Sequence, residues 1–297
     1  MQIQSYIENK ELASKVKFGI RPIIFSIWIV SGILILSSCL PERKIANDFI
    51  QSQHVLNLLV NPPEFVFKYN HKGEIVEGFD SLSESKQDSA LWSSSIFVQY
   101  LNDSIVLETY MNKFITELRD LGFNVYLASD IDSFMTGKPQ SYIVDIAQIQ
   151  VDEYFYPLLD QEDFMDTTYY KKINLNAVDF SSWFELHKAN AENVKKMVLY
   201  SSSTSYDSFD GRFFNDPFTG AVRYKYTIDT LNLKDVYAMA TYLGKKHADY
   251  MYDYFMNQYI AKHLPEGMKM MDYYHYDRNR KTFAPAYEER FDILGPK

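Results

Sequence analysis

The residues that could carry chemistry are few and lie far apart in the chain. None of the six histidines belongs to a His-Glu-x-x-His pair, the helical zinc motif of metalloproteases. The chain also has no glycine-rich phosphate loop and no Gly-x-Ser-x-Gly nucleophile elbow. His247 and His263 fall in an apolar helix pattern, where a core or surface histidine is a simpler interpretation than a ligand. We therefore predict no catalytic residue, metal or cofactor.

Two other segments have side chains that could bind a ligand. Asp207, Asp210, Asn215 and Asp216 could offer oxygen ligands to calcium, but their spacing differs from the EF-hand pattern, and a hydrogen-bonded surface turn is the favoured interpretation. Aromatic faces can also stack on sugars, although such residues more often fasten a tail to its own domain. The aromatic residues of the C-terminal tail are Tyr273, Tyr274, Tyr276, Phe283, Tyr287 and Phe291.

The only cysteine, Cys39, follows a segment typical of a secretory signal. The apolar run Ile23 to Leu36 is fourteen residues long. As a helix it would reach roughly 21 Å, short of the roughly 30 Å hydrocarbon core that a permanent anchor must cross. The basic residues before it are Lys10, Lys15, Lys17 and Arg21. Residues 1–38 are therefore expected to be an export signal.

The four residues Leu36-Ser37-Ser38-Cys39 resemble the bacterial lipobox, a branched apolar residue and two small residues before a cysteine. The resemblance implies that diacylglycerol is attached to the Cys39 sulfur, that signal peptidase II cuts before this residue, and that the new amine is open to acylation. Two or three acyl chains hold a protein firmly on a membrane. Lipidation also accounts for a thiol that has no possible intramolecular disulfide partner. The alternatives are an uncleaved anchor, or an ordinary secretory signal with an incidental cysteine.

Sorting within the envelope is predicted from the residues after Cys39. Leu40 occupies the position where aspartate would resemble an inner-membrane retention signal. Residues 41–44 lack the acidic cluster that resembles a surface-export signal in Bacteroidota. We expect the periplasmic leaflet of the outer membrane. Glu8 and Glu11 lie in an unusually long segment before the apolar run, so a start near Lys17 is an alternative.

Composition excludes nucleic acid as a partner. Without residues 1–38 the chain keeps 26 Lys and Arg against 37 Asp and Glu, a net charge of −11. With 46% hydrophobic and 16% aromatic residues it can bury a sizeable core.

Two helices stand out in the hydrophobic pattern. Asp103 to Leu121 has apolar residues at three- and four-residue spacing, with Asn102 or Asp103 as a possible cap and Gly122 as a stop: Leu107, Tyr110, Met111, Phe114, Ile115 and Leu118. A longer helix is expected over 233–263, ended by Pro265 and Gly267, with one apolar stripe: Val236, Ala240, Leu243, His247, Met251 and Tyr254.

Strands are predicted on both sides of the first helix. Their ranges are 55–60, 65–69, 123–128, 142–155, 171–178, 179–186, 194–202 and 221–228, and a loop is expected over 207–220. In 142–155 the residues Ala147, Ile149 and Val151 alternate with Gln148 and Gln150, so one face should be wet.

These elements predict an α/β (or α+β) fold with one mixed sheet flanked by helices and a long C-terminal helix, behind the lipoprotein signal. The expected parts are the signal (1–38), a lipidated N-terminus and tether (39–54), a globular domain (55–263) and the aromatic tail (264–297). The element order over Val55 to His263 resembles periplasm-facing envelope lipoproteins, such as penicillin-binding-protein activators and the auxiliary lipoproteins of lipid-exporting ABC transporters. No functional residue follows from this resemblance.

Two classes of function remain open. The favoured one is a non-catalytic module that is held on the membrane by lipid on Cys39 and binds an envelope protein partner. The alternative is a glycan-binding protein or hydrolase whose site is assembled only in the folded chain.

A recurrent tripeptide, Asp-Ser or Asp-Thr followed by Leu, Ala, Ile or Thr, resembles the sequon of general O-glycosylation in Bacteroidota. It occurs five times, and Asp103 of one copy is already explained as a helix cap. The residues expected to carry glycan, in segments predicted to be exposed turns, are Ser81, Ser89, Thr167 and Thr230.

Replacing Cys39 with alanine should abolish lipid labelling and leave unprocessed precursor in the inner membrane, because the acyl acceptor is lost. Metabolic labelling with a tagged fatty acid measures this directly. Label on the alanine variant would show that Cys39 is not the lipidation site.

Overall fold

The computed structural model describes residues 41–52, 56–75, 78–136, 140–189, 196–287 and 290–295. The predicted signal and Cys39 lie outside them. The chain forms two compact units, Met1–Gln53 with Met256–Tyr273, and His54–Phe255 with Tyr274–Lys297. Among the described helices, none is both long and apolar enough to span a membrane.

The smaller unit contains helix α3 (Pro41–Gln51) and the last turns of α7 (Leu233–His263). The ring of Phe49 packs on Tyr259 with 5.4 Å between centroids. The carboxylate of Glu42 accepts a hydrogen bond from the Met271 amide at 2.7 Å.

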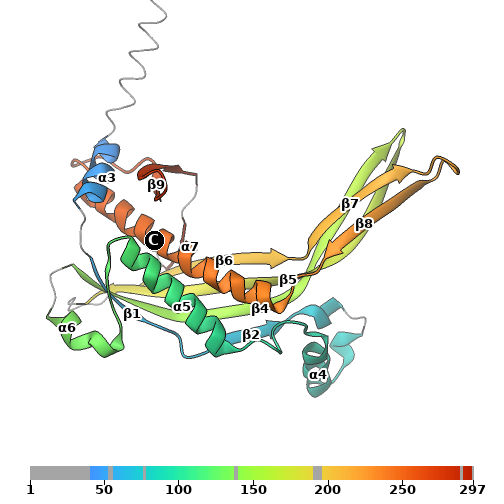
Figure 1. Cartoon of the computed structure of the whole chain (residues 1–297), viewed down its shortest axis with the longest axis horizontal. Helices are drawn as coiled ribbons and strands as arrows, with labels where there is room; N and C mark the ends of the chain where they lie inside the picture. The colour runs from blue at the N-terminus through green and yellow to red at the C-terminus, as the bar shows by residue number, and fades with distance from the viewer. Residues whose placement is uncertain are drawn as a thin grey trace, which may run out of the picture. The chain divides into compact units, whose positions relative to one another are not determined.

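The larger unit confirms the α/β prediction, with one mixed seven-stranded sheet (Figure 1). The strand order is β11-β6-β5-β4-β1-β3, and β2 pairs with β4 farther along that strand. Pairing is parallel among β1, β2, β3 and β4, and antiparallel across β4, β5, β6 and β11. The strands are β1 (Asn57–Asn61), β2 (Val66–Asn70), β3 (Asn124–Tyr126), β4 (Ser141–Phe164), β5 (Thr167–Lys188), β6 (Met197–Tyr206) and β11 (Asp292–Leu294).

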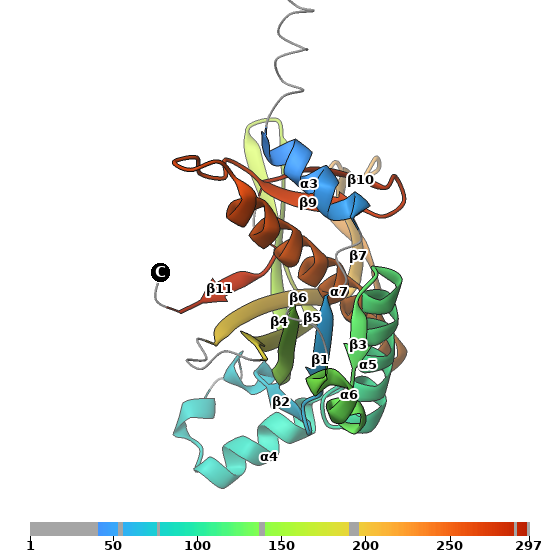
Figure 2. The same ribbon diagram turned by 90° about the vertical axis from the view of Figure 1, so that its left-hand side faces the viewer.

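Helices α5 (Asp103–Asp120) and α7 pack on the same face of this sheet, as Figure 2 shows. Both contact Phe184 of β5, since its ring lies 6.1 Å from Phe114 of α5 and 5.2 Å from His247 of α7. The two helices cross closely at Gly244, where a Cβ would lie 2.5 Å from the backbone oxygen of Tyr110. Only glycine fits this crossing.

Both long helices are confirmed, α7 with its predicted boundaries and stripe and α5 one residue shorter than predicted. Asn102 caps α5 by accepting a hydrogen bond from the Ile105 amide, and Gly122 follows the helix with a φ of 92°. All six stripe residues of α7 are buried, and four of the six in α5 are, namely Tyr110, Met111, Phe114 and Leu118.

Three strand predictions are wrong. Ranges 171–178 and 179–186 form one strand, β5, and β4 continues nine residues beyond Phe155. The loop expected over 207–220 contains strand β7 (Ser208–Asn215), which pairs with β8 (Val222–Asp229). The sequence of β7 does alternate polar residues with Phe209, Gly211 and Phe213, and the Asp and Gly content of the segment concealed this period.

The alternation predicted for β4 is interrupted by a bulge. The register with β5 shifts between Ile146 and Gln148, which leaves Ala147 exposed. Beyond the bulge Ile149 and Val151 are buried as expected. The bulge therefore sets which face of β4 is turned to the helices.

The remaining elements are short. Between β2 and α5 lie η3 (Lys72–Ile75), η4 (Phe79–Ser81) and α4 (Glu84–Ser94), and η5 (Ala128–Asp130) and α6 (Ile131–Met135) follow β3. The tail expected over 264–297 contains the hairpin β9 (Tyr273–Asp277) and β10 (Thr282–Ala286) before β11.

A buried carboxylate joins the segment after β2 to the middle of β4. Glu153 has no solvent exposure, and Lys72 of η3 donates to it at 2.6 Å. The Ser95 hydroxyl donates at 2.7 Å, and the successive amides of residues 96–98 donate at 2.8 to 3.0 Å. We call this group the Glu153 clasp: Glu153, Lys72, Ser95 and the amides of 96–98.

The donors of the clasp explain why the carboxylate of Glu153 stays ionised although it is buried. Burial alone would raise the pKa of Glu153, but the Ile96 and Val98 amides, Lys72 and Ser95 outweigh it and hold the pKa below its usual value. Successive amides that converge on one anion form a nest of partial positive charge.

Replacing Glu153 with glutamine should lower the free energy of unfolding by about 3 to 5 kcal/mol, because it leaves the Lys72 ammonium buried and unpaired. Since the folded pKa of Glu153 is depressed, its contribution is complete above its ordinary value of about 4.5 and is lost as the pH falls below it. Urea unfolding at pH 7 and pH 3.5 measures both effects.

The matched control is Glu185→Gln, which removes a carboxylate from an exposed ion pair with Lys196. Its cost should be at most about 1 kcal/mol. Equal losses in the two variants would contradict the role given to the clasp.

Candidate functional site

Two ribbons of strand extend past the part of the sheet that the helices cover (Figure 1). β1 and β2 pair with β4 only up to Glu153, and β6 pairs with β5 only from Ala177 onward. Residues 154–164 of β4 therefore pair with β5 alone, over a length of about 36 Å. We call residues 154–176 the β4–β5 ribbon.

Strands β7 and β8 form the second ribbon, residues 208–229, which packs on the first. The Tyr224 hydroxyl donates to Asp160 at 2.7 Å, and the ring of Phe213 lies 6.3 Å from that of Tyr169. Lys171 lies over the ring of Tyr226 at 5.9 Å. Partial burial and the carboxylates of Asp160 and Asp210 raise the pKa of Tyr224, so its hydroxyl keeps its proton and donates. We call the two ribbons together the arm.

The arm joins the sheet at Asp207, a buried carboxylate at the bend between β6 and β7. One of its oxygens accepts from the backbone and side-chain amides of Asn176 at 2.8 Å, and the other accepts from the Leu231 amide at 2.8 Å. Asn176 in turn accepts from Lys72 of the Glu153 clasp at 2.9 Å. A continuous polar chain thus fixes the base of the arm to the core.

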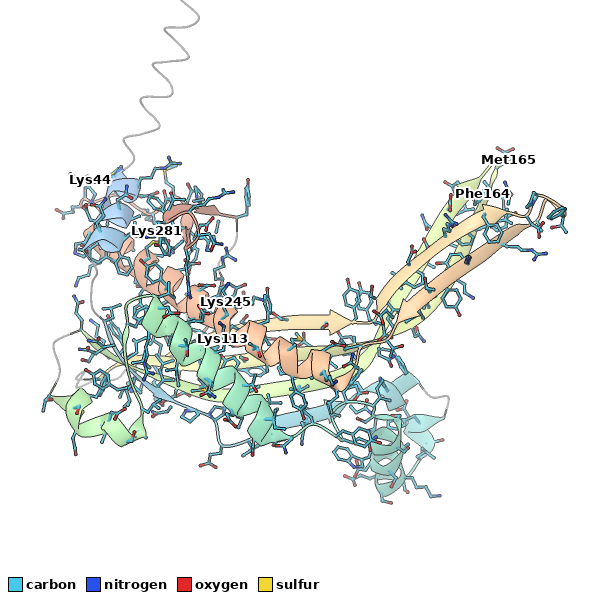
Figure 3. The ribbon with its side chains drawn as sticks, viewed as in Figure 1. Lys44, Lys113, Phe164, Met165, Lys245 and Lys281 are labelled. Carbon is cyan, nitrogen blue, oxygen red and sulfur yellow. The ribbon has the colours of Figure 1, made fainter. Side chains whose placement is uncertain are left out.

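The tip of the β4–β5 ribbon presents a methionine in an unfavourable backbone conformation. Met165 has a φ of 54° and is 98% exposed, directly after Phe164 (Figure 3). Glycine is the residue that hairpin turns prefer at a positive φ, because a side chain there is strained. A fully exposed methionine gains nothing from packing, so its side chain is a candidate contact for a partner.

The tip of the β7–β8 ribbon holds one aromatic ring in solvent. Phe218 is 96% exposed. The Asp216 carboxylate accepts from the Phe218 amide at 2.9 Å and from Arg223 at 2.8 Å. These bonds fix the backbone of the turn before a partner binds. Burying the Phe218 ring against a partner therefore orders no additional loop and costs little conformational entropy.

Charge differs between the tip of the first ribbon and the second ribbon as a whole. The first tip, residues 160–168, has four carboxylates and no base: Asp160, Glu162, Asp163 and Asp166. The second ribbon balances three acids against three bases, Arg212, Arg223 and Lys225. Other large apolar side chains exposed along the arm are Tyr156, Leu159, Tyr170, Phe214, Tyr226 and Ile228.

The residues predicted to carry glycan all lie exposed, but in different surroundings. Ser81 ends η4, and Thr167 begins β5 beside the Met165 tip. Thr230 lies between β8 and α7. Ser89 is in helix α4, where its hydroxyl donates to the Ser85 carbonyl, so the turn expected there is wrong.

The predicted oxygen-rich segment 207–220 contains strand β7 and the turn that leads to β8, and two of its acids hold backbone amides. Asp207 and Asp216 bind the amides described above, while Asp210 lies on β7. His263 is exposed, and its ring contacts the Tyr259 carbonyl at 2.8 Å.

His247 lies in the core between α5 and α7. The Tyr110 hydroxyl lies 2.8 Å from its Nδ1. Burial, assisted by the nearby Lys246 charge, lowers the pKa of His247 to about 3, so the ring is neutral. These contacts describe a core histidine.

From Tyr274 onward, the aromatic tail packs within the larger unit. Tyr274 is buried against Phe283, Tyr276 lies 4.9 Å from Tyr252, and Phe291 lies 5.2 Å from Phe184. Tyr287 is exposed.

An acid and a histidine meet where the tail crosses α7. Asp253 accepts from the Tyr276 amide at 2.8 Å and lies 2.9 Å from Nδ1 of His275 and 3.7 Å from Arg290. Burial raises the pKa of Asp253, and these partners offset it only in part. An Asp–His pair orients the base in hydrolytic triads. Within the described residues, however, His275 has no hydroxyl or thiol in hydrogen-bond contact, so the geometry supports a structural pairing.

No protein-family model matches the chain, and no curated protein matches it in sequence. The described residues also contain no group of three or more His, Cys, Asp or Glu side chains arranged to hold a metal.

Replacing Asp207 with alanine should leave the amides of Asn176 and Leu231 without an acceptor and destabilise the base of the arm by roughly 2 kcal/mol or more. Hydrogen exchange should become faster at both amides. Asp210→Ala, on the exposed side of β7, should change stability by about 0.5 kcal/mol or less. Unchanged protection in the Asp207 variant would show that this carboxylate does not fix the arm.

Proposed function

We propose that this protein is a lipid-anchored envelope module, attached through Cys39, that binds a protein partner with the tips of its arm. The single observation that carries the proposal is the pair of exposed tip residues, Met165 and Phe218. The partner surface that fits them has apolar pockets and a basic rim near the first tip.

Each tip places an apolar side chain where packing within the folded chain does not stabilise it. Met165 holds a φ that stores roughly 1 kcal/mol or more of strain, and Phe218 exposes almost its whole ring. Neither contributes to the core. Apolar side chains that project from a fixed backbone are typical of interface anchors, because binding buries them without ordering a loop.

Membrane attachment would make a weak contact sufficient. A lipid on Cys39 would confine the module to the bilayer surface, which raises its effective concentration toward any neighbour in the same envelope. The acidic first tip disfavours anionic lipid headgroups as the target and favours a basic protein surface.

Met165→Gly separates binding from folding. Glycine suits the backbone of this turn, so the variant should be as stable as the parent or slightly more stable. It should nevertheless reduce partner capture about tenfold when combined with Phe218→Ser, because both anchors are then missing. A lysine-reactive crosslinker added to native envelopes measures capture by the parent and by the double variant, and photo-crosslinkers placed singly at positions 165 and 218 in the parent identify the partner.

Matched controls come from Tyr242 on α7 and Tyr287 in the tail, which are exposed but distant from the tips in sequence. A photo-crosslinker at either position should not trap the same protein. The proposal is overturned if all four positions trap the same set of proteins, or if the double variant captures partner as well as the parent does.

A further inference from the structure

The second face of the sheet, opposite α5 and α7, carries an organised set of polar and aromatic side chains. Helix contacts go to the first face, where Lys246 of α7 donates to Ser203 and Tyr254 donates to Met197. Residues that oppose one another across paired strands lie on one face. On the second face the register aligns Gln148 with Trp183 and Tyr200, Gln150 with Ser181 and Ser202, and Asp152 with Asp179 and Thr204.

Hydrogen bonds connect the polar side chains of this face into two ladders. Along β4, Gln148 donates to Gln150 at 2.9 Å, and Gln150 donates to both oxygens of Asp152 at 2.8 and 3.0 Å. Across β5 and β6, Asp179 accepts from Ser181 at 3.0 Å and from Thr204 at 2.7 Å. These side chains are held in place before a ligand binds.

Aromatic rings stand on both sides of the ladders. Trp183 and Tyr200 oppose each other on β5 and β6 with ring centroids 4.9 Å apart. On β2, Phe67 aligns with Gln150 and Tyr69 aligns with Asp152. From β2 to β6 the face crosses four strands, or about 14 Å, which is wide enough for a short oligosaccharide.

We propose that this face binds a neutral glycan, with Trp183 and Tyr200 as the stacking platform. Aromatic faces complement the apolar C–H surfaces of sugar rings. Carboxylate, amide and hydroxyl groups in one ladder offer the mixed donors and acceptors that neighbouring sugar hydroxyls require. This inference stands independently of the partner proposed for the arm.

The charges on the face select against other ligands. Asp152 and Asp179 both lie among the polar residues of this face. The nearby basic side chains already have carboxylate partners, since His71 lies 3.2 Å from Asp152 and Lys196 donates a hydrogen bond to Glu185. Negative potential repels uronic acids, phosphates and anionic headgroups. The class that fits is therefore neutral hexose or N-acetylhexosamine oligosaccharide.

The test uses the full-length protein in detergent on an array of neutral gluco-, manno-, galacto- and N-acetylglucosamine oligosaccharides, with uronic acid oligosaccharides beside them. Positive glycans are then titrated by calorimetry. Trp183→Ala should weaken binding by about tenfold, whereas Trp183→Phe should retain most of it, because a ring remains to stack. Uronic acid oligosaccharides should bind at least about tenfold more weakly than neutral ones.

The control is Trp92→Ala, which removes an exposed tryptophan from helix α4 and should leave glycan affinity unchanged. Crosslinking from position 165 should be normal in Trp183→Ala, which separates this site from the arm. The proposal is overturned if the array shows no neutral glycan binding, or if Trp183→Ala binds the same glycans as tightly as the parent.

Discussion

Glu153 is a charge placed where water cannot reach it, and three parts of the chain meet around its carboxylate. Its donors come from η3 and from the residues after α4, and Lys72 also donates to Asn176 at the base of the arm. An anion of this kind is tolerable only when every lone pair faces a donor. The segment between β2 and α5 must therefore return to the sheet, because it supplies the amides that neutralise the charge.

The same arrangement explains how the arm keeps its direction. A ribbon of two strands is only marginally stable by itself. Here β4 begins and β5 ends in the core of the sheet, and Asp207 fastens the second ribbon to Asn176 of the first. Contacts such as Tyr224 with Asp160 then continue the packing outward. Contacts that begin in the core and continue along the arm therefore hold the tips in position.

The sequence was most informative where a helix has one buried stripe. The stripes of α5 and α7 predicted both helices almost to the residue, because apolar spacing alone determines which face packs. Strand length was not predictable in this way. Beyond Glu153 β4 pairs only with β5, from Tyr154 with Ala177 to Phe164 with Thr167. A segment that contains Pro157 and is rich in acids toward its turn does not distinguish a ribbon from a loop.

The candidate sites were missed for a related reason. No motif links Trp183 to Tyr200 or Gln148, since they meet only through strand register. The bulge at Ala147 changes which residues of β4 share a face, so alternation counted from Tyr142 fails halfway along the strand. One available signal was Met165 between Phe164 and Asp166, a methionine between two strand-like tyrosine-rich stretches.

The continuity of β4 and β5 has a mechanical consequence. A load applied at the tip along the strand axis would pull both strands together and would act as shear on the ladders that join β4 to β1 and β2, and β5 to β6. A sideways load at the tip would instead bend the ribbon about its base, beyond the last pairs with β2 and β6. Resistance to force should thus depend on direction, so the arm would be stiff toward a neighbour that pulls along its length and more compliant toward one that pushes across it.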